Sequence, residues 1–260
     1  MSTELVHYAV DDAVATITLD SPHNRNALSS ALVQQLGDHL AAAAADDAVR
    51  AVLLTHTGGT FCAGADLSEA SGGSPKDSTA TLVALLKSLV ALPKPVVARI
   101  DGHVRAGGLG LVGACDIVIA GPQTSYAFTE VRLGLAPAMI SLTVLPRIAQ
   151  RAASRYFLTG EKFDAATAER IGLVTVATDD TEATTAGVLD ALRKGSPQGL
   201  RESKALTTVP VLRALDEDAD RLADLSARLF ASDEAREGML SFLERRPPRW
   251  ATPTPAEETP

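Results

Sequence analysis

Apolar and polar positions along the first 45 residues predict two strands followed by a helix. Residues 14–19 (VATITL) alternate apolar and polar side chains and are rich in β-branched residues, which is typical of a half-exposed strand. A shorter strand is expected just before it, near residues 6–10. Ser29 is a good N-cap for a helix that runs to about Ala45. Its apolar residues recur at helical spacing: Leu32, Val33, Leu36 and Leu40.

The order of strands and helices continues through the middle of the chain. Residues 51–55 and 95–100 are almost wholly apolar, as strands covered on both faces are, and residues 117–120 form a third such run. A short helix is expected to begin near Ala65. Leucines at helical spacing between residues 82 and 90 predict a longer helix. The repeated order of strands and helices predicts an α/β fold.

The pattern changes beyond residue 140, where helical segments dominate up to about residue 243. A helical part of this kind buries its apolar stripe against the core or against a second subunit. We therefore expect three parts: a core over residues 1–195, a helical C-terminal part over residues 196–250, and a disordered tail, rich in Pro and Glu, over residues 251–260.

Composition narrows the class of protein. The 260 residues are 46% hydrophobic and 22% charged, which favours a packed domain over a disordered chain. The net charge of −8 is spread along the chain, so we expect neither nucleic acid nor a membrane among its partners. No apolar run approaches the ~20 residues of a membrane span, and the N-terminus lacks a signal-peptide pattern, which predicts a cytoplasmic protein.

The cysteines and histidines predict neither disulfides nor a metal site. Cys62 and Cys115 are too few for a disulfide framework and form no C-x-x-C pair, so we interpret them as small buried apolar residues. The five histidines show none of the spacings typical of zinc ligands. We therefore expect no metal.

One segment, AGGLGLVGACD, contains a G-x-G-x-x-G at Gly108, Gly110 and Gly113. A dinucleotide fingerprint needs its first glycine directly after a strand and a full helix before the next strand. Here residues 101–107 separate the preceding strand from the glycines, and three residues separate Gly113 from the following strand. Glu130 lies 17 positions past the last glycine, near where a ribose-binding acid would stand. The missing helix nevertheless disfavours a dinucleotide site.

A second small-residue segment, GGTFCAGADL, has the same arrangement of an apolar strand, a small-residue loop and an expected helix start. Helix starts present N–H groups that have no acceptor inside the helix, so two of them side by side can form an oxyanion hole. The small residues would let a substrate carbonyl come within hydrogen-bond distance of the backbone. They are Ala63, Gly64, Ala65, Gly107 and Gly108.

Six segments extend the pattern over nearly the whole chain: ATITLDSPHNRNALS, FCAGADLSE, KPVVARIDGHVRAGGLGLVGACDIVIA, FTEVRLGLAPA, LTGEKFDAATAERIGLV and FLERRPPRW. In this order they resemble the crotonase, or enoyl-CoA hydratase/isomerase, superfamily. The resemblance implies a spiral of ββα units with a helical C-terminal part used for trimerisation. It also implies a homotrimer or a dimer of trimers that binds acyl-CoA thioesters. No separate cofactor is implied, because coenzyme A is part of the substrate.

The resemblance also implies roles for individual residues. The N–H groups of Ala65 and Gly107 match the family's oxyanion donors, and Glu130 matches a catalytic glutamate. Arg245 or Arg246 would reach the CoA phosphates of a neighbouring subunit. The residues that match the substrate-binding part of the family, or line its carbonyl site, are Arg25, Ala27, Leu28, Ala63, Gly64, Asp66, Leu67, Gly108 and Gly110.

The sequence departs from the well-known hydratases of the family, which use two glutamates, because Gly110 stands at the first of these positions. Three activities remain open. The favoured one is a hydratase in which Glu130 alone moves the protons. The same glutamate could instead move a proton between C2 and C4, as in an isomerase, or the protein could be a CoA-thioester binder with weak chemistry.

Overall fold

The computed structural model describes residues 3–66, 68–69 and 75–251, and so leaves out residues 252–260 of the expected tail. Its strands are β1 (Val6–Asp11), β2 (Val14–Leu19), β3 (Ala51–His56), β4 (Thr60–Cys62), β5 (Val96–Ile100), β6 (His103–Arg105), β7 (Ile117–Ala120), β8 (Ser125–Ala127), β9 (Phe163–Asp164) and β10 (Val176–Ala177). Its α-helices are α1 (Ser30–Ala45), α2 (Pro75–Ala91), α3 (Gly107–Ala114), α4 (Ala138–Val144), α5 (Gln150–Thr159), α6 (Ala165–Ile171), α7 (Thr181–Arg193), α8 (Pro197–Thr207), α9 (Val209–Phe230) and α10 (Asp233–Leu243). Three 3-10 helices complete the described chain: η1 (Pro22–Asn24), η2 (Glu130–Leu133) and η3 (Arg249–Ala251).

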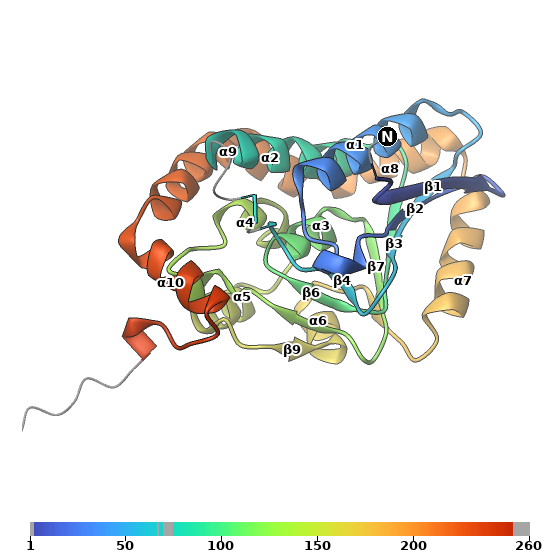
Figure 1. The fold of residues 1–260 in the computed structure, drawn as a ribbon. Helices are drawn as coiled ribbons and strands as arrows, with labels where there is room; N and C mark the ends of the chain where they lie inside the picture. Colours follow the sequence, from blue (N-terminus) through green and yellow to red (C-terminus); the bar gives the residue numbers. More distant parts are fainter. Residues whose placement is uncertain (1–2, 67, 70–74, 252–260) are drawn as a thin grey trace, which may run out of the picture.

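The strands form two sheets (Figure 1). The larger has the order β1-β2-β3-β5-β7-β10, and the smaller has the order β4-β6-β8-β9. Strands β1 and β2 of the first unit both belong to the larger sheet, whereas in the next three pairs (β3 and β4, β5 and β6, β7 and β8) the first strand joins the larger sheet and the second joins the smaller one. A helix follows each of these units along the chain. The predicted α/β spiral of ββα units is therefore confirmed.

Local signals account for the elements that the sequence predicted best. Helix α1 begins where the serine cap was expected, because the Ser29 side chain accepts a hydrogen bond from the Leu32 N–H at 3.3 Å. Strands β3 and β5 are parallel neighbours in the interior of the larger sheet, which explains their apolar sequences. Cys62 and Cys115 are both free and buried, as predicted.

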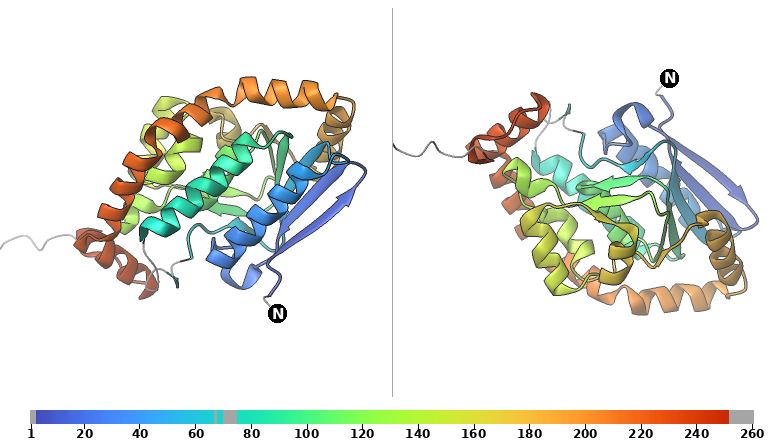
Figure 2. Two further views of the ribbon diagram at one scale, coloured as in Figure 1. Left: turned by 90° about the horizontal axis from the view of Figure 1, so that it is seen from above. Right: turned by 90° about the horizontal axis from the view of Figure 1, so that it is seen from below.

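The described chain after residue 195 is helical, and it packs on the core (Figure 2). Helix α9 lies along α2 and α4. Helix α8 is tied to the core through Lys204, whose Nζ lies 2.8 Å from Asp116 Oδ2 and donates to the Leu89 carbonyl at 2.9 Å. No helix in the described ranges is long and apolar enough to cross a membrane.

Three short strands that the sequence pattern did not predict organise the smaller sheet. Strands β4, β6 and β8 have three residues each, too few to show an alternation of apolar and polar positions. They are parallel neighbours, with Cys62 paired to Val104 and Arg105 paired to Ala127. Their carboxyl ends therefore lie side by side at one edge of this sheet.

The expected helix near Ala65 is wrong. Ala65 forms an isolated parallel bridge with Leu28, and residues 68 and 69 form a turn. The Asp66 carboxylate organises this turn by accepting hydrogen bonds from the Ser68 N–H at 3.0 Å and the Ser68 hydroxyl at 2.6 Å. An aspartate that binds the backbone two residues ahead competes with the helical conformation.

Candidate active site

Three predicted catalytic residues come from three neighbouring strand ends. Ala65 lies three residues past the end of β4, Gly107 two past the end of β6, and Glu130 three past the end of β8. Because these strands are parallel and adjacent, their following loops emerge at the same edge of the sheet. A hydrogen bond from the Ala106 N–H to the Ala127 carbonyl, at 3.2 Å, joins the second loop to the third.

The loops that carry Ala65 and Gly107 touch through their backbones. A Cβ at Gly64 would lie only 3.1 Å from the Gly107 nitrogen, and a Cβ at Gly107 would lie 3.5 Å from the Ala65 nitrogen. Gly64 has a φ of +94°, a conformation that favours glycine. The Leu28 N–H donates to the Gly64 carbonyl at 2.8 Å and holds this loop from the other side. The two predicted donors are thus close neighbours.

Both predicted donor N–H groups lack a backbone acceptor among the described residues. Gly107 is the first residue of α3, where N–H groups have no acceptor inside the helix. No hydrogen bond donated by the Ala65 N–H occurs within the described ranges. The expectation of two helix starts is corrected here, since only Gly107 stands at a helix N-terminus and only it benefits from a helix dipole.

Glu130 is the first residue of η2, and its carboxyl group is poorly solvated. Its Oε2 atom is buried and has no hydrogen-bond partner among the described residues. Burial raises the pKa of Glu130 to about 7, and a hydrogen bond to its own backbone opposes the shift only in part. A carboxyl group with such a pKa can both take up and release a proton near neutral pH.

Apolar side chains fill the space that a side chain would need at Gly110, the position of the missing glutamate. A Cβ there would lie 2.9 Å from Ile140 Cγ2 and 3.5 Å from Leu86 Cδ1. The Gly110 carbonyl accepts a hydrogen bond from the Thr143 hydroxyl at 2.9 Å, so α4 covers this side of α3. Position 110 cannot hold a carboxylate unless these side chains move.

The other glycines of the G-x-G-x-x-G serve close packing. All three lie inside α3. A Cβ at Gly108 would lie 2.8 Å from the Cys62 carbonyl oxygen, and one at Gly113 would lie 2.8 Å from that of Thr143. These glycines therefore bring α3 close to β4 and α4, whereas a dinucleotide fingerprint needs them in a loop before its helix.

The predicted substrate-binding segment at residues 25–28 lies against the Ala63–Ala65 loop. Arg25 is exposed, and its carbonyl accepts a hydrogen bond from the Ala63 N–H at 3.1 Å, while Ala27 is buried. Sequence reasoning overlooked Asn26, which is fully buried. The Asn26 amide donates to the carbonyls of Thr57 and Thr60 at 3.1 and 2.8 Å, and its Oδ1 accepts from the Ser21 N–H at 2.6 Å.

Two charged side chains near these loops have partners within the protein. Asp66 accepts from Asn24 Nδ2 at 3.1 Å, and its hydrogen bonds with Ser68 lower its pKa. Arg105 donates to the Ser125 carbonyl at 2.5 Å and to the Ser125 hydroxyl at 2.8 Å. Leu67, a further predicted substrate-binding residue, lies outside the described residues.

The two arginines predicted to reach CoA phosphates differ in their surroundings. Arg245 is exposed, with a φ of +55°. Arg246 forms a bidentate pair with Glu237 at 2.7 and 3.1 Å and also donates to Glu244 at 2.6 Å. Arg245 is therefore the better placed of the two for a ligand. Within the described ranges, no three His, Cys, Asp or Glu side chains are grouped to hold a metal ion.

Comparison with known proteins agrees with this geometry. The family model described as enoyl-CoA hydratase/isomerase matches residues 9–253. A 2,3-dehydroadipyl-CoA hydratase of Escherichia coli is 32% identical over 242 residues, which cover 90% of this chain and 94% of the relative. A mevalonyl-coenzyme A hydratase of Aspergillus fumigatus is 32% identical over 250 residues, with 91% of each chain covered.

A solved structure agrees with the fold. The crystal structure of an enoyl-CoA hydratase from Mycobacterium avium matches this chain with a TM-score of 0.91 and 57% sequence identity. The match covers 96% of this chain and 100% of that one. The fold is thus that of the crotonase superfamily, whose members process acyl-CoA thioesters. Within it, the chain belongs to the enoyl-CoA hydratase/isomerase family.

Proposed function

We propose that the protein is an enoyl-CoA hydratase that adds water across the 2,3 double bond of an acyl-CoA thioester. The observation that carries the proposal is the carboxyl group of Glu130, whose buried Oε2 has no hydrogen-bond partner among the described residues and which follows the strand next to the loops of Ala65 and Gly107. The names of the relatives support hydration as the reaction.

In the proposed reaction, the ionised Glu130 takes a proton from water while the water oxygen bonds to C3. The double-bond electrons move toward the thioester, and the resulting enolate oxygen accepts hydrogen bonds from the Ala65 and Gly107 N–H groups. The protonated Glu130 then delivers its proton to C2, which completes the addition and restores the carboxylate. The reaction is redox-neutral, so we propose no cofactor beyond the coenzyme A of the substrate.

The two N–H groups would contribute to catalysis because charge grows on the thioester oxygen in the transition state. In other oxyanion holes, removal of one donor costs about 2.7–4 kcal/mol of barrier, or about 10²–10³ in rate. Backbone donors held by Gly64 and Leu28 need little reorganisation when the substrate arrives.

A second candidate is an enoyl-CoA isomerase with the same glutamate. The observation that favours it is the apolar closure of position 110 by Ile140 and Leu86, because a second carboxylate that would help to hold water is missing there. Proton transfer between C2 and C4 needs one base and no water. We nevertheless favour hydration, because the similar proteins are named as hydratases.

Mass spectrometry separates the candidates. The protein is incubated in H₂¹⁸O with short, long, branched and carboxylated enoyl-CoAs, and the products are compared with those of Glu130→Gln. Hydration adds one labelled water, whereas isomerisation leaves the mass unchanged and moves the double bond. Turnover that persists in Glu130→Gln would contradict the role of Glu130, and binding without turnover of any substrate would leave a CoA-thioester binder.

We also propose that the protein assembles as a homotrimer or a dimer of trimers. The support is a group of large apolar side chains exposed on the C-terminal helices of a single chain: Leu240, Phe242, Leu243 and Trp250. Light scattering after size-exclusion chromatography gives the mass directly, and a monomer at micromolar concentration would contradict this part of the proposal.

A further inference from the structure

Helix α10 packs directly on the turn that carries Glu130. A Cβ at Gly238 of α10 would lie 2.4 Å from the Leu133 carbonyl oxygen at the end of η2. A Cβ at Gly134, the residue after η2, would lie 2.6 Å from the Glu234 carbonyl carbon. Glycines at both positions thus let the two backbones meet, and Gly134 has the φ of +71° that favours glycine.

The turn itself has little internal support. η2 is a single 3-10 turn of four residues, closed by hydrogen bonds from the Gly134 and Leu135 N–H groups to the Glu130 carbonyl. Such short elements depend on their neighbours for a fixed position. On its other side the turn contacts α5 and Gly160. The position of Glu130 therefore depends on what holds α10 in place.

Glu237 is the side chain that ties α10 to the end of the described chain. It is 7% exposed and stands directly before Gly238. Besides its bidentate pair with Arg246, it accepts a hydrogen bond from the Arg249 N–H at 3.0 Å. The hydrogen bonds from Arg246 lower the pKa of Glu237 to about 2, so it stays ionised in neutral solution.

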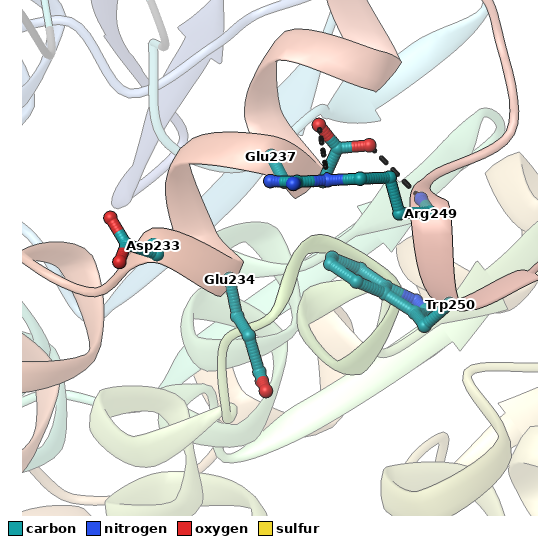
Figure 3. A pocket seen from close by; sticks show the side chains of 5 residues that line it. All are labelled: Asp233, Glu234, Glu237, Arg249 and Trp250. Carbon is teal, nitrogen blue, oxygen red and sulfur yellow. Dashed lines mark hydrogen bonds and ion pairs between the residues drawn. The ribbon is translucent and has the colours of Figure 1, made fainter.

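Figure 3 shows the contacts between Glu237 and Arg249 from close by, with the Arg249 side chain across the Glu237 carboxylate and Asp233 pointing away from it. The residues drawn line a surface pocket of about 400 Å³ between α10 and η3. Residues 244–251 thereby form a strap over α10, with Glu237 as its attachment point.

We propose that Glu237 is a positioning residue for Glu130: by binding Arg246 and the Arg249 backbone it fixes the C-terminal half of α10, the helix that packs on η2, and so keeps the Glu130 carboxyl group in place and away from water. The kinetic part of this inference rests on the proposed function. The structural part does not.

Charged groups do not explain the environment of Glu130. The elements packed against η2 carry Arg151 and Arg155 on α5 and Asp233, Glu234, Arg236 and Glu237 on α10, and η2 itself carries Arg132 besides Glu130. Arg155 is paired with Glu161 at 2.5 Å, and none of these charges contributes to the raised pKa of Glu130, which comes from burial. Loosening of α10 would therefore change the pKa of Glu130 by letting water reach its carboxyl group.

The test uses the full chain and three variants. Glu237→Gln removes the charge that binds Arg246. Arg246→Gln removes the partner of Glu237 at a more exposed position. If Glu237→Gln fails to fold, Arg246→Gln tests the proposal in its place. Asp233→Asn is the matched control, because Asp233 pairs with Arg236 at 2.6 Å on the exposed face of the same helix. Arg246→Lys keeps the charge and should restore part of the effect.

Two readouts are independent of turnover. The pKa of Glu130 is followed by NMR of ¹³Cδ-labelled glutamate, with Glu130→Gln used to assign the signal, and amide hydrogen exchange is followed over residues 130–135. In Glu237→Gln and Arg246→Gln we expect the Glu130 pKa to fall by about one unit as water enters and exchange to become at least about tenfold faster. Asp233→Asn should match the wild type in both.

The kinetic readout adds a specific signature. We expect kcat to fall about tenfold with KM within about twofold, because a misplaced base slows chemistry more than binding. Unchanged Glu130 pKa and exchange in both strap variants, or equal changes in Asp233→Asn, would overturn the proposal. If the pKa and exchange respond but the wild type turns over no enoyl-CoA, the positioning role stands and the proposed function fails.

Discussion

Ile140 occupies the space that a side chain at position 110 would need, with its Cγ2 atom 2.9 Å from the place of a Cβ on Gly110. Both residues are buried, Ile140 on α4 and Gly110 in the middle of α3. The missing first glutamate is therefore accompanied by a compensating apolar side chain 30 positions along the chain. Replacement of Gly110 alone should not restore a two-glutamate site.

Gly110→Glu should lower the free energy of unfolding by more than about 3 kcal/mol, because it overfills a packed contact and buries a carboxylate. Ile140→Ala alone should cost about 2–5 kcal/mol. In the double variant the two losses should be less than additive by at least about 1 kcal/mol, since the smaller alanine makes room for the glutamate. Urea denaturation of the four proteins measures this coupling, and strict additivity would show that the two residues do not compete for space.

Gly64→Ala should impair the proposed oxyanion site more than the fold. The added methyl group would lie 2.9 Å from Ala106 Cβ and 3.1 Å from the Gly107 nitrogen, at a backbone conformation strained for alanine. We expect kcat for hydration to fall by about 10²–10³. Gly59→Ala, at the opposite end of β4 and with open space around its Cβ position, is the control. A Gly64→Ala protein with the kcat of Gly59→Ala would contradict the role of these amides.

The sequence predicted the parts of this fold whose signals are local. The cap at Ser29 and the apolar strands β3 and β5 depend on neighbouring residues or on burial of a whole segment, so their patterns are visible in one dimension. The strands β4, β6 and β8 are held by pairing with each other, and three residues show no period. These unpredicted strands bring the predicted site residues to one edge of the sheet.

The candidate site shows the same limit. Ala65, Gly107 and Glu130 were found through the family resemblance, whereas nothing local distinguishes Ile140 or Asn26. Ile140 matters because of its contact with Gly110, and Asn26 because its amide joins Ser21, Thr57 and Thr60, and both relations exist only after folding. The helix expected at Ala65 failed because the Asp66 side chain binds the Ser68 backbone in a turn.

Ala106→Gly should stabilise the protein. Ala106 has φ +43° and ψ −120°, a combination that is costly for any residue with a Cβ, and it immediately precedes the Gly107 donor. Relief of this strain should exceed the entropic cost of glycine and raise the free energy of unfolding by about 1 kcal/mol. Thermal and urea unfolding measure the change, and Ala91→Gly at the end of α2, an alanine in a helix, should show the opposite sign. A destabilised Ala106→Gly would mean that the conformation is not strained.

Glu130→Gln should stabilise the protein at neutral and alkaline pH while abolishing hydration. Burial raises the pKa of Glu130 to about 7 from an ordinary value of 4.5, so the folded state holds this proton over a range of pH in which the unfolded state has released it. The wild type therefore loses stability relative to the variant as pH rises from about 4.5 to 7 and then loses no more. The full difference is about 3 kcal/mol, from roughly 2.5 pKa units at about 1.36 kcal/mol each.

The activity of the wild type should rise over the pH range in which its stability falls, because the ionised carboxylate of Glu130 is the base. Its kcat/KM should therefore increase with pH to a plateau above about 7. The two curves together form the test: urea denaturation of wild type and Glu130→Gln at pH 4 and pH 8, and kcat/KM of the wild type between them. Equal stability of the two proteins at pH 8 would mean that the ionised carboxylate is well solvated. A plateau that begins near pH 4.5 would mean the same, and either result would remove the physical basis for Glu130 as a base with a pKa near neutrality.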